Sequence, residues 1–208
     1  MKKIFLSSIA AFFFTLVSGC GPKVMVPPQI DLKQYEIIGI IEFSSSAKGA
    51  LGDLSTKRFV EEIRKDQGII RVVYLGTEDE VIKSVGRNRM SPTVLKEIGK
   101  KFDVSTIFFG QLKVSDVKPN IRYSPGLGYI SFSAEVEASL DVQLVETLTG
   151  ASIWSSSAND TNNIGKISFF EGKNYSFDAK DPEKAYGKLV NGLVKKVTKD
   201  FKVTWQHK

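Results

Sequence analysis

The stretch ISFSAEVEASLDVQL, residues 130–144, alternates apolar and polar side chains without a break. Successive side chains of a β-strand point to opposite faces, so this alternation predicts one long antiparallel strand with a buried face and a wet face. Residues 147–150 supply a turn, and residues 151–157 are expected to return as the antiparallel partner. The polar positions of the wet face include Glu135, Glu137, Ser139 and Asp141.

Strands and helices alternate on either side of this segment. Residues 36–43, EIIGIIEF, are almost all apolar and predict a central strand buried on both faces. Further elements are expected as strands over 69–75 and 104–114, and as helices over 53–65 and from Thr77, Ser91 and Asp181. The chain is therefore predicted to be α/β: a single domain with a mixed, partly antiparallel sheet flanked by helices.

Residues 118–129, which come just before the long strand, contain Pro119, Pro125 and two glycines. This composition argues against a second long strand that pairs with residues 130–144. The glycine-rich part, SPGLG at 124–128, lacks the spacing of a phosphate-binding motif. It predicts a hairpin turn or a mobile loop.

The first twenty residues have the order of a secretory signal. Lys2 and Lys3 precede an apolar stretch over 4–17, which is too short to span a bilayer as a mature helix, and small residues follow it. The end of this segment, VSGC, resembles the bacterial lipobox, in which the cysteine receives a diacylglycerol and the new amino terminus is acylated, commonly with palmitate. Cys20 is the only cysteine of the chain, which favours lipidation over an ordinary signal that happens to end near a cysteine. A cleaved lipoprotein signal peptide is therefore expected over 1–19.

The segment after the cysteine is predicted to be an extended tether over residues 20–35. Its prolines, Pro22, Pro27 and Pro28, are expected to prevent regular pairing. Thirteen residues, 21–33, at about 3.3 Å each reach only ~43 Å. A folded domain over 36–208 would thus stay close to the membrane that holds its acyl chains, and several acyl chains anchor a protein almost permanently. Gly21, where inner-membrane lipoproteins typically carry Asp, favours the outer membrane of a Gram-negative cell.

The composition offers little for catalysis or nucleic-acid binding. The formal net charge is +6, and without Lys2 and Lys3 of the expected signal peptide 27 basic residues face 23 acidic ones, which gives +4 and is too weak to imply nucleic acid. His207 is the only histidine, so a His-based triad or a multi-histidine metal site is not expected. No catalytic, cofactor-binding or metal-binding residue is predicted, and the protein is expected not to be an enzyme. Four aromatic residues stand in the polar loop over 159–180: Phe169, Phe170, Tyr175 and Phe177. They either fold back onto the core or form a surface that contacts a partner or a membrane.

Four segments together resemble the family of bacterial lipoproteins that includes the curli secretion component CsgG and the penicillin-binding-protein activator LpoB. These segments are IIGIIEFSSS (37–46), GDLSTKRFVEEI (52–63), SPTVLKEIGKKFDVSTIFFGQL (91–112) and LDVQLVETLTGASIWSSS (140–157). The resemblance implies an α/β domain with a mixed sheet, no catalytic residues, and binding of other envelope proteins.

The combined expectation is a lipid-anchored, periplasm-facing adaptor or assembly factor of the bacterial outer membrane, with an envelope protein as its partner. The wet strand face and the aromatic loop are the two candidate contact surfaces. One alternative is an oligomeric secretion-pore subunit that resembles the curli channel, since residues 130–144 are long enough to span a membrane as a strand. Another is an activator of a peptidoglycan synthase, for which the tether is short.

Overall fold

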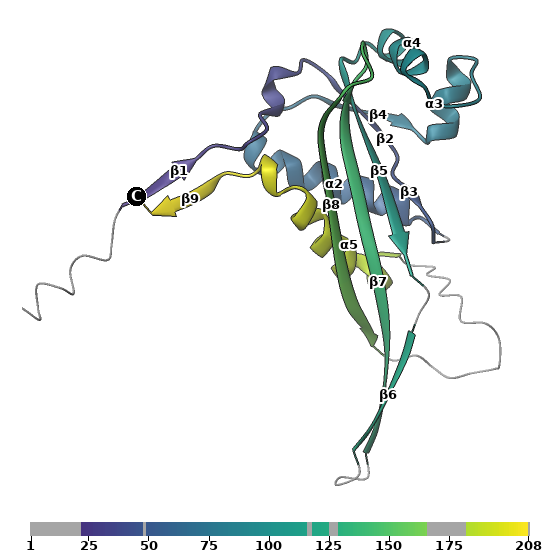
Figure 1. Cartoon of the computed structure of the whole chain (residues 1–208), viewed down its shortest axis with the longest axis vertical. Coiled ribbons are helices and arrows are strands. Elements are labelled where there is room, and N and C mark those ends of the chain that lie inside the picture. The colour runs from purple at the N-terminus through teal and green to yellow at the C-terminus, as the bar shows by residue number, and fades with distance from the viewer. Residues whose placement is uncertain (1–21, 48, 116–117, 125–128, 166–181, 208) are drawn as a thin grey trace, which may run out of the picture.

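The computed structural model describes residues 22–47, 49–115, 118–124, 129–165 and 182–207. Its centre is a seven-stranded mixed sheet in the order β4-β2-β5-β7-β6, with β3 beside β5 and β8 beside β7 (Figure 1). The strands are β2 (Ile38–Ile41), β3 (Ser44–Ser45), β4 (Val72–Gly76), β5 (Thr106–Val114), β6 (Lys118–Ser124), β7 (Tyr129–Glu146) and β8 (Ser152–Gly165). β2 runs parallel to β4 and β5, whereas β7 runs antiparallel to β5, β6 and β8. This arrangement confirms the predicted α/β domain with a mixed sheet flanked by helices.

Helices cover the two faces of the sheet unequally. Helices α2 (Leu51–Gln67) and α5 (Pro182–Val197) lie across one face, whereas α3 (Glu78–Ser84) and α4 (Pro92–Phe102) cover only one end of the other face (Figure 1). Local sequence sets their limits. Thr77 and Glu80 form a capping box at the start of α3, and the Ser91 side chain caps α4 ahead of Pro92. Gly68 follows α2 at a φ of 69°, which a glycine adopts without strain.

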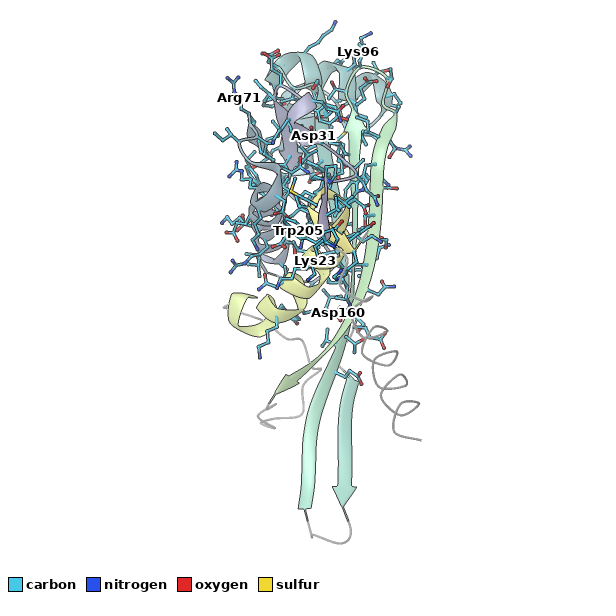
Figure 2. All side chains as sticks on the ribbon, turned by 90° about the vertical axis from the view of Figure 1, so that its left-hand side faces the viewer. Lys23, Asp31, Arg71, Lys96, Asp160 and Trp205 are labelled. Atoms are coloured by element: carbon cyan, nitrogen blue, oxygen red, sulfur yellow. The ribbon has the colours of Figure 1, made fainter. Side chains whose placement is uncertain are left out.

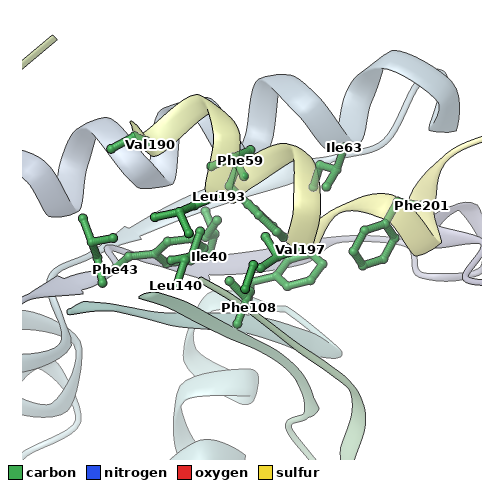
Figure 3. Close-up of a cluster of buried hydrophobic side chains, with 14 of the residues drawn as sticks. Ile40, Phe43, Phe59, Ile63, Phe108, Leu140, Val190, Leu193, Val197 and Phe201 are labelled. Carbon is green, nitrogen blue, oxygen red and sulfur yellow. The ribbon is translucent and has the colours of Figure 1, made fainter. Parts of the chain in front are cut away.

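The main core fills the space between the sheet and the α2/α5 layer. Phe59 of α2 meets Phe43 at 5.3 Å and Phe108 of β5 at 5.0 Å between ring centroids, both in tilted or edge-on geometry (Figure 3). The apolar face of β7 joins this core through Val136, Leu140 and the residues that alternate with them. From Val136 to Leu144, where the side chains are described, the alternation seen in the sequence therefore places one face of β7 in the interior, as predicted.

A smaller core lies between the sheet and the α3/α4 pair. Ile98 of α4 and Ile107 of β5 are fully buried there. Strand β4, at the edge of the sheet, begins later than the predicted range of 69–75. Ile69 is 98% exposed because the chain leaves α2 through the turn at Gly68 and reaches the sheet only at Val72.

Strands β5 and β6 pair with the same edge of β7, one after the other along its length. Val114 of β5 pairs with Ala138, and Lys118 of β6 pairs with Glu135, so the chain forms a long hairpin whose β6 end extends beyond the helical layers (Figure 1). The expectation that residues 118–129 form no return arm is thus wrong. Pro119 is tolerated because β6 is an edge strand, where a missing backbone N–H breaks few ladder bonds. Pro125 lies outside the described residues.

A second, separate ribbon joins residues from opposite ends of the described chain. Strand β1 (Lys23–Val26) pairs antiparallel with β9 (Thr204–His207) and projects from the body (Figure 1). The expectation that the prolines prevent pairing is wrong, because Pro22 and Pro27 flank β1 and neither lies inside it. Residues predicted as tether also enter the body, since Leu32, in the short helix η1 (Leu32–Gln34), is completely buried.

Candidate protein-binding face

The end of the sheet that α3 and α4 leave uncovered presents a polar face formed by β5, β7 and β8, which we call the open face. The strand register sets which side chains lie side by side on this face. Asp141 of β7, for example, pairs with Gln111 of β5 on one side and with Ser157 of β8 on the other. The open face comprises Gln111, Lys113, Glu135, Glu137, Ser139, Asp141, Gln143, Ser155, Ser157, Asn159 and Thr161. The structure therefore places all four predicted residues of β7 on one surface. Their contact with a partner stays a prediction.

Asp141 occupies the middle of the open face and is held by both neighbouring strands. The Ser157 hydroxyl donates to Asp141 Oδ1 at 2.5 Å, and Lys113 Nζ lies 3.9 Å from Oδ2. The long Lys113 pair is too exposed to add much stability. The hydroxyl contact does orient the carboxylate, so Asp141 is a positioned charge in the middle of a polar surface.

A groove of about 560 Å³ lies where the open face meets α3 and α4. Apolar residues form much of its lining: Ile41, Met90, Pro92, Leu95, Phe109 and Val145. Ser44, Ser91, Gln111 and Gln143 line it as well. Three carboxylates border it, from Glu42 after β2, Glu78 of α3 and Asp141 of β7. Among the described residues that line the groove there is no lysine or arginine. Two of the carboxylates have a lysine nearby outside the lining, because Lys113 lies 3.9 Å from Asp141 and Lys57 interacts electrostatically with Glu42. The groove thus combines apolar side chains with an excess of carboxylates at its border.

Two of these carboxylates have fixed surroundings. The Tyr74 hydroxyl donates to the Glu42 carboxylate, and partial burial, this hydrogen bond and the Glu42 charge all raise the pKa of Tyr74 above its usual value. The phenol therefore stays protonated at physiological pH. Glu78 stands in the first turn of α3, where the helix dipole favours a negative charge.

A second depression, of about 500 Å³, lies farther along the open face and is more polar. Glu137 and Ser139 line it together with Lys113 and residues of β8. Its rim is tied to the helical layer because Lys196 Nζ of α5 lies 3.0 Å from Asp160 Oδ1 and also donates to the Asn159 carbonyl. The predicted row of β7 is therefore split, with Asp141 at the apolar groove and Glu137 and Ser139 at the polar depression.

Sequence reasoning identified the β7 part of this surface and missed the rest. Phe109, Glu42 and Glu78 come from three different elements, so no local pattern links them. Cys20 and the aromatic residues Phe169, Phe170, Tyr175 and Phe177 lie outside the described residues. Within the described part of the chain, no group of three or more His, Cys, Asp or Glu side chains could hold a metal ion. No described helix is both long and apolar enough to cross a membrane.

Comparisons with known proteins give structural neighbours only. No family model matches the chain, and no curated protein matches it. The PelC dodecamer from Paraburkholderia phytofirmans is similar at 11% identity and a TM-score of 0.44, over 87% of this chain and 97% of that one. Lipoprotein GNA1162 from Neisseria meningitidis is similar at 13% identity and 0.38, over 64% and 87%. The LpoB C-terminal domain from Salmonella enterica is similar at 10% identity and 0.36, over 65% and 84%.

The neighbours include LpoB, one of the two proteins that the sequence segments resemble. With TM-scores below 0.5 and identities near 10%, these similarities assign no function. The resemblance to the curli secretion component stays a prediction.

Proposed function

We propose that this protein is a lipid-anchored, periplasm-facing, non-enzymatic component of the bacterial cell envelope that binds a partner protein through the groove at the open face. The observation that carries the proposal is the groove itself, which joins apolar side chains to the carboxylates of Glu42, Glu78 and Asp141 and has no lysine or arginine among its described lining residues. A protein segment that carries apolar and basic side chains is complementary to such a surface. The lipobox-like VSGC sequence with Cys20 supports a position of this surface close to a membrane.

The partner's segment is expected to be short and exposed. The groove volume of about 560 Å³ accommodates a few side chains, whereas a stable interface buries about 800 Å² per partner. The remaining contact area would come from the open face beside it, including Gln143 and Ser157. The groove then supplies the central anchor, and the polar rows supply the rim.

Site-specific photo-crosslinking in cells of the source bacterium tests this proposal. A photoreactive amino acid at Gln143, which borders the groove, is expected to yield one discrete adduct, and Glu78→Lys is expected to reduce that adduct severalfold by reversing a groove charge. The matched control places the same photoreactive residue at Glu61, an exposed position of α2 on the other side of the sheet. The proposal fails if both positions give the same adducts, or if Glu78→Lys leaves the Gln143 adduct unchanged.

The anchor is tested separately. Cys20→Ser is expected to release a folded protein from the membrane fraction, and mass spectrometry of the wild-type protein is expected to show acyl chains at Cys20. Retention of the Cys20→Ser variant on membranes would contradict lipid anchoring without bearing on the groove.

The long hairpin favours a second candidate, a subunit that assembles with copies of itself. Strand β6 and the adjoining part of β7 extend beyond the helical layers, and β8 is an edge strand along 14 residues (Figure 1). Such edges can pair with another chain. The seven residues of β6 are fewer than the roughly 9–11 that a membrane-spanning strand needs. Mass photometry of the detergent-extracted protein, with and without residues 119–134 replaced by a short turn, is expected to show a hairpin-dependent oligomer, and a monomer in both cases would exclude it.

Activation of a synthase in the inner membrane fits this structure less well. Only residues 21 and 22 separate Cys20 from β1, so the chain has no long free spacer before its first paired strand.

A further inference from the structure

The β1/β9 ribbon exposes apolar side chains away from the main body. Within the described residues, these two strands pair with each other only, and neither joins the central sheet. Trp205 is 62% exposed and Met25 56%, and Val24, on the opposite side of the ribbon, is 43% exposed. A two-stranded ribbon by itself is at best marginally stable in water, and clustered exposed apolar residues usually mark a contact surface. We therefore expect an external surface to cover the exposed apolar side chains of the ribbon.

The pairing of β1 with β9 brings apolar, aromatic and basic side chains to one face of the ribbon. Met25 pairs directly with Trp205, and Lys23 pairs with His207. Because alternate residues share a face, Lys23, Met25, Trp205 and His207 lie on the same side of the ribbon. An indole has an apolar body and a polar N–H, and a lysine can keep its ammonium group in water while its methylenes contact apolar material. This combination is typical of residues at a membrane–water interface.

The base of the ribbon is fixed to the body. The backbone N–H of Ile30 donates to the carbonyl of Asp200 at 3.1 Å, which joins the two segments that lead into β1 and β9. The buried Gln67 side chain donates to the carbonyls of Ile30 and Phe201 at 2.8 and 2.9 Å. In Figure 2 the ribbon points toward the viewer, with Lys23 and Trp205 labelled. Its root is therefore held by the body, and the ribbon is a defined projection.

The position of Cys20 identifies a lipid surface as the occupant. Cys20 precedes Lys23 by three residues, which at about 3.3 Å each span only ~10 Å. The headgroup region on each side of a bilayer is several ångströms thick, so a lipidated Cys20 would hold β1 at or within it. The ribbon contains Lys23 and no acidic residue, which suits anionic headgroups. Its eight residues are too few for a stable protein interface, which uses about 20–30 residues a side.

We propose that the β1/β9 ribbon lies in the membrane–water interface, with Met25 and Trp205 among the headgroups of an anionic lipid surface. The proposal rests on the lipid anchor of the proposed function, and adds a second contact that sets how the domain stands on the membrane. A single anchored cysteine leaves a domain free to rotate about its tether. A second contact at Trp205, which the body holds through Gln67, restricts that rotation.

Tryptophan fluorescence tests the proposal directly, because Trp154 and Trp205 are the only tryptophans of the chain. The lipidated Trp154→Phe protein, reconstituted in vesicles of phosphatidylethanolamine and phosphatidylglycerol at 3:1, retains only Trp205. Lipids brominated near the headgroup are expected to reduce its emission at least twofold, and lipids brominated near the acyl chain ends to reduce it less. The matched control is Trp205→Phe, whose remaining Trp154 is 8% exposed in the core and is expected to show no quenching.

The outcomes separate the ribbon from the anchor. Vesicle-bound protein whose Trp205 is not quenched would overturn the ribbon proposal and leave the anchor intact. A blue-shifted Trp205 emission that depends on protein concentration and not on lipid would also overturn it, in favour of contact between copies.

An assay without the acyl chains tests the ribbon when lipidation itself fails. The Cys20→Ser protein is expected to bind phosphatidylglycerol vesicles weakly and in a salt-dependent way, and Trp205→Ser is expected to lower this binding severalfold. Ile69→Ser, which also removes an exposed apolar side chain, serves as the control and is expected to leave the binding unchanged. Equal binding by the Trp205→Ser protein and its parent would overturn the proposal.

Discussion

The side-chain amide of Gln67 donates a hydrogen bond of 2.9 Å to the backbone carbonyl of Phe201, and so joins the end of α2 to η2 (Lys199–Phe201). The same amide donates to the Ile30 carbonyl, and Gln67 Oε1 accepts from the backbone N–H of Leu32 at 2.8 Å. One buried side chain of α2 thus satisfies three polar backbone groups from two other segments, residues 30–32 and residue 201, which are distant in the sequence.

We expect Gln67→Ala to destabilise the domain by about 3 kcal/mol, because the substitution leaves several buried backbone groups without partners. Urea unfolding followed by circular dichroism measures this loss. Asp66→Ala, at the exposed neighbouring position, should change the unfolding free energy by less than about 0.5 kcal/mol. A loss below 1 kcal/mol for Gln67→Ala would show that the hydrogen bonds of Gln67 to Ile30, Leu32 and Phe201 are dispensable for stability.

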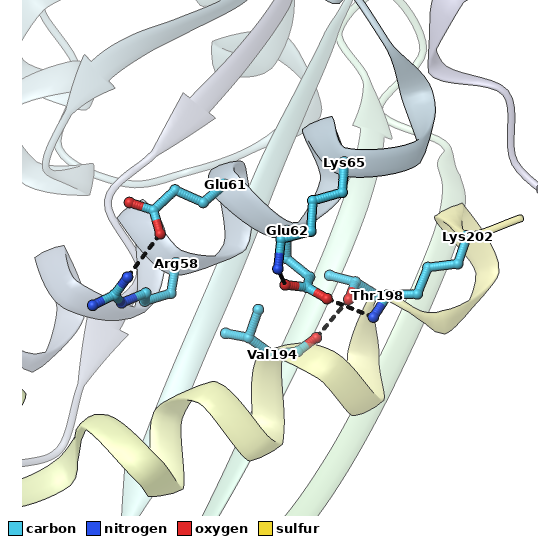
Figure 4. Close-up of polar contacts among 7 residues, drawn as sticks. All are labelled: Arg58, Glu61, Glu62, Lys65, Val194, Thr198 and Lys202. Atoms are coloured by element: carbon cyan, nitrogen blue, oxygen red, sulfur yellow. Dashed lines mark hydrogen bonds and ion pairs between the residues drawn. The ribbon is translucent and has the colours of Figure 1, made fainter.

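Acid should weaken the contact between α2 and the segment after η2. The Glu62 carboxylate is 9% exposed and accepts from Lys65 and, at 2.5 Å, from Lys202 (Figure 4). Burial alone would raise the pKa of Glu62, but the hydrogen bonds and charges of the two ammonium groups outweigh it, so the pKa is lowered. Because the pKa of Glu62 is lower in the folded state than in the unfolded state, the ionised carboxylate stabilises the fold. This stabilisation is complete at a pH above the unfolded-state pKa, near 4.3, and is lost as the pH falls through the folded-state pKa.

Glu62→Gln should therefore reduce the unfolding free energy at pH 7, with a difference from the wild-type protein that shrinks progressively below pH 5. Denaturant titrations at pH 7, 5 and 3 measure this trend. Glu61→Gln is the matched control, because the Glu61 side chain is 59% exposed in its pair with Arg58. A wild-type advantage that stays constant from pH 7 to pH 3 would contradict the assignment.

A side chain at position 110 should disturb the main core. A Cβ atom at Gly110 would lie 2.5 Å from the ring of Phe43, which already packs on Phe59 at 5.3 Å. We expect Gly110→Ala to cost roughly 1–3 kcal/mol through overpacking. The same substitution made together with Phe43→Leu should cost less than it does alone, and a double-mutant cycle by thermal unfolding measures that coupling. Additive effects would show that the strand moves aside instead.

Partner binding at the groove should depend on salt. Because Glu42, Glu78 and Asp141 border the groove, a basic segment would bind more weakly as sodium chloride screens these charges. Once the crosslinked partner is identified, calorimetric titration should show Glu78→Lys lowering affinity about tenfold, a change of about 1.4 kcal/mol. Glu61→Lys, the same reversal on the opposite helical layer, should have no such effect, and equal losses from both would indicate a nonspecific charge effect.

The parts of the fold that could be predicted from the sequence are those that depend on residues close to one another in the chain. The alternation of residues 130–144 was sufficient to assign the faces of β7, and Thr77, Ser91 and Gly68 mark helix limits through local hydrogen bonds and dihedral preferences. The wet face of β7 was predictable for the same reason.

Features that depend on position in the finished sheet were not predictable in this way. Pro119 indicates a break when read locally, yet an edge strand tolerates it. Strand β1 has four residues without alternation, and only its distant partner β9 makes it a strand. The groove combines residues of β2, α3 and β7, which become neighbours only after the sheet has formed.

The pairing of β1 with β9 also constrains how the protein matures. Among the described residues, β1 pairs with β9 only. Residues 23–26 therefore stay unpaired until residues 204–207 have been synthesised. Closing so large a loop is slow relative to local pairing. The segment next to Cys20 would therefore remain extended and accessible to processing enzymes while the rest of the domain folds, and closure of the ribbon would mark the end of that interval.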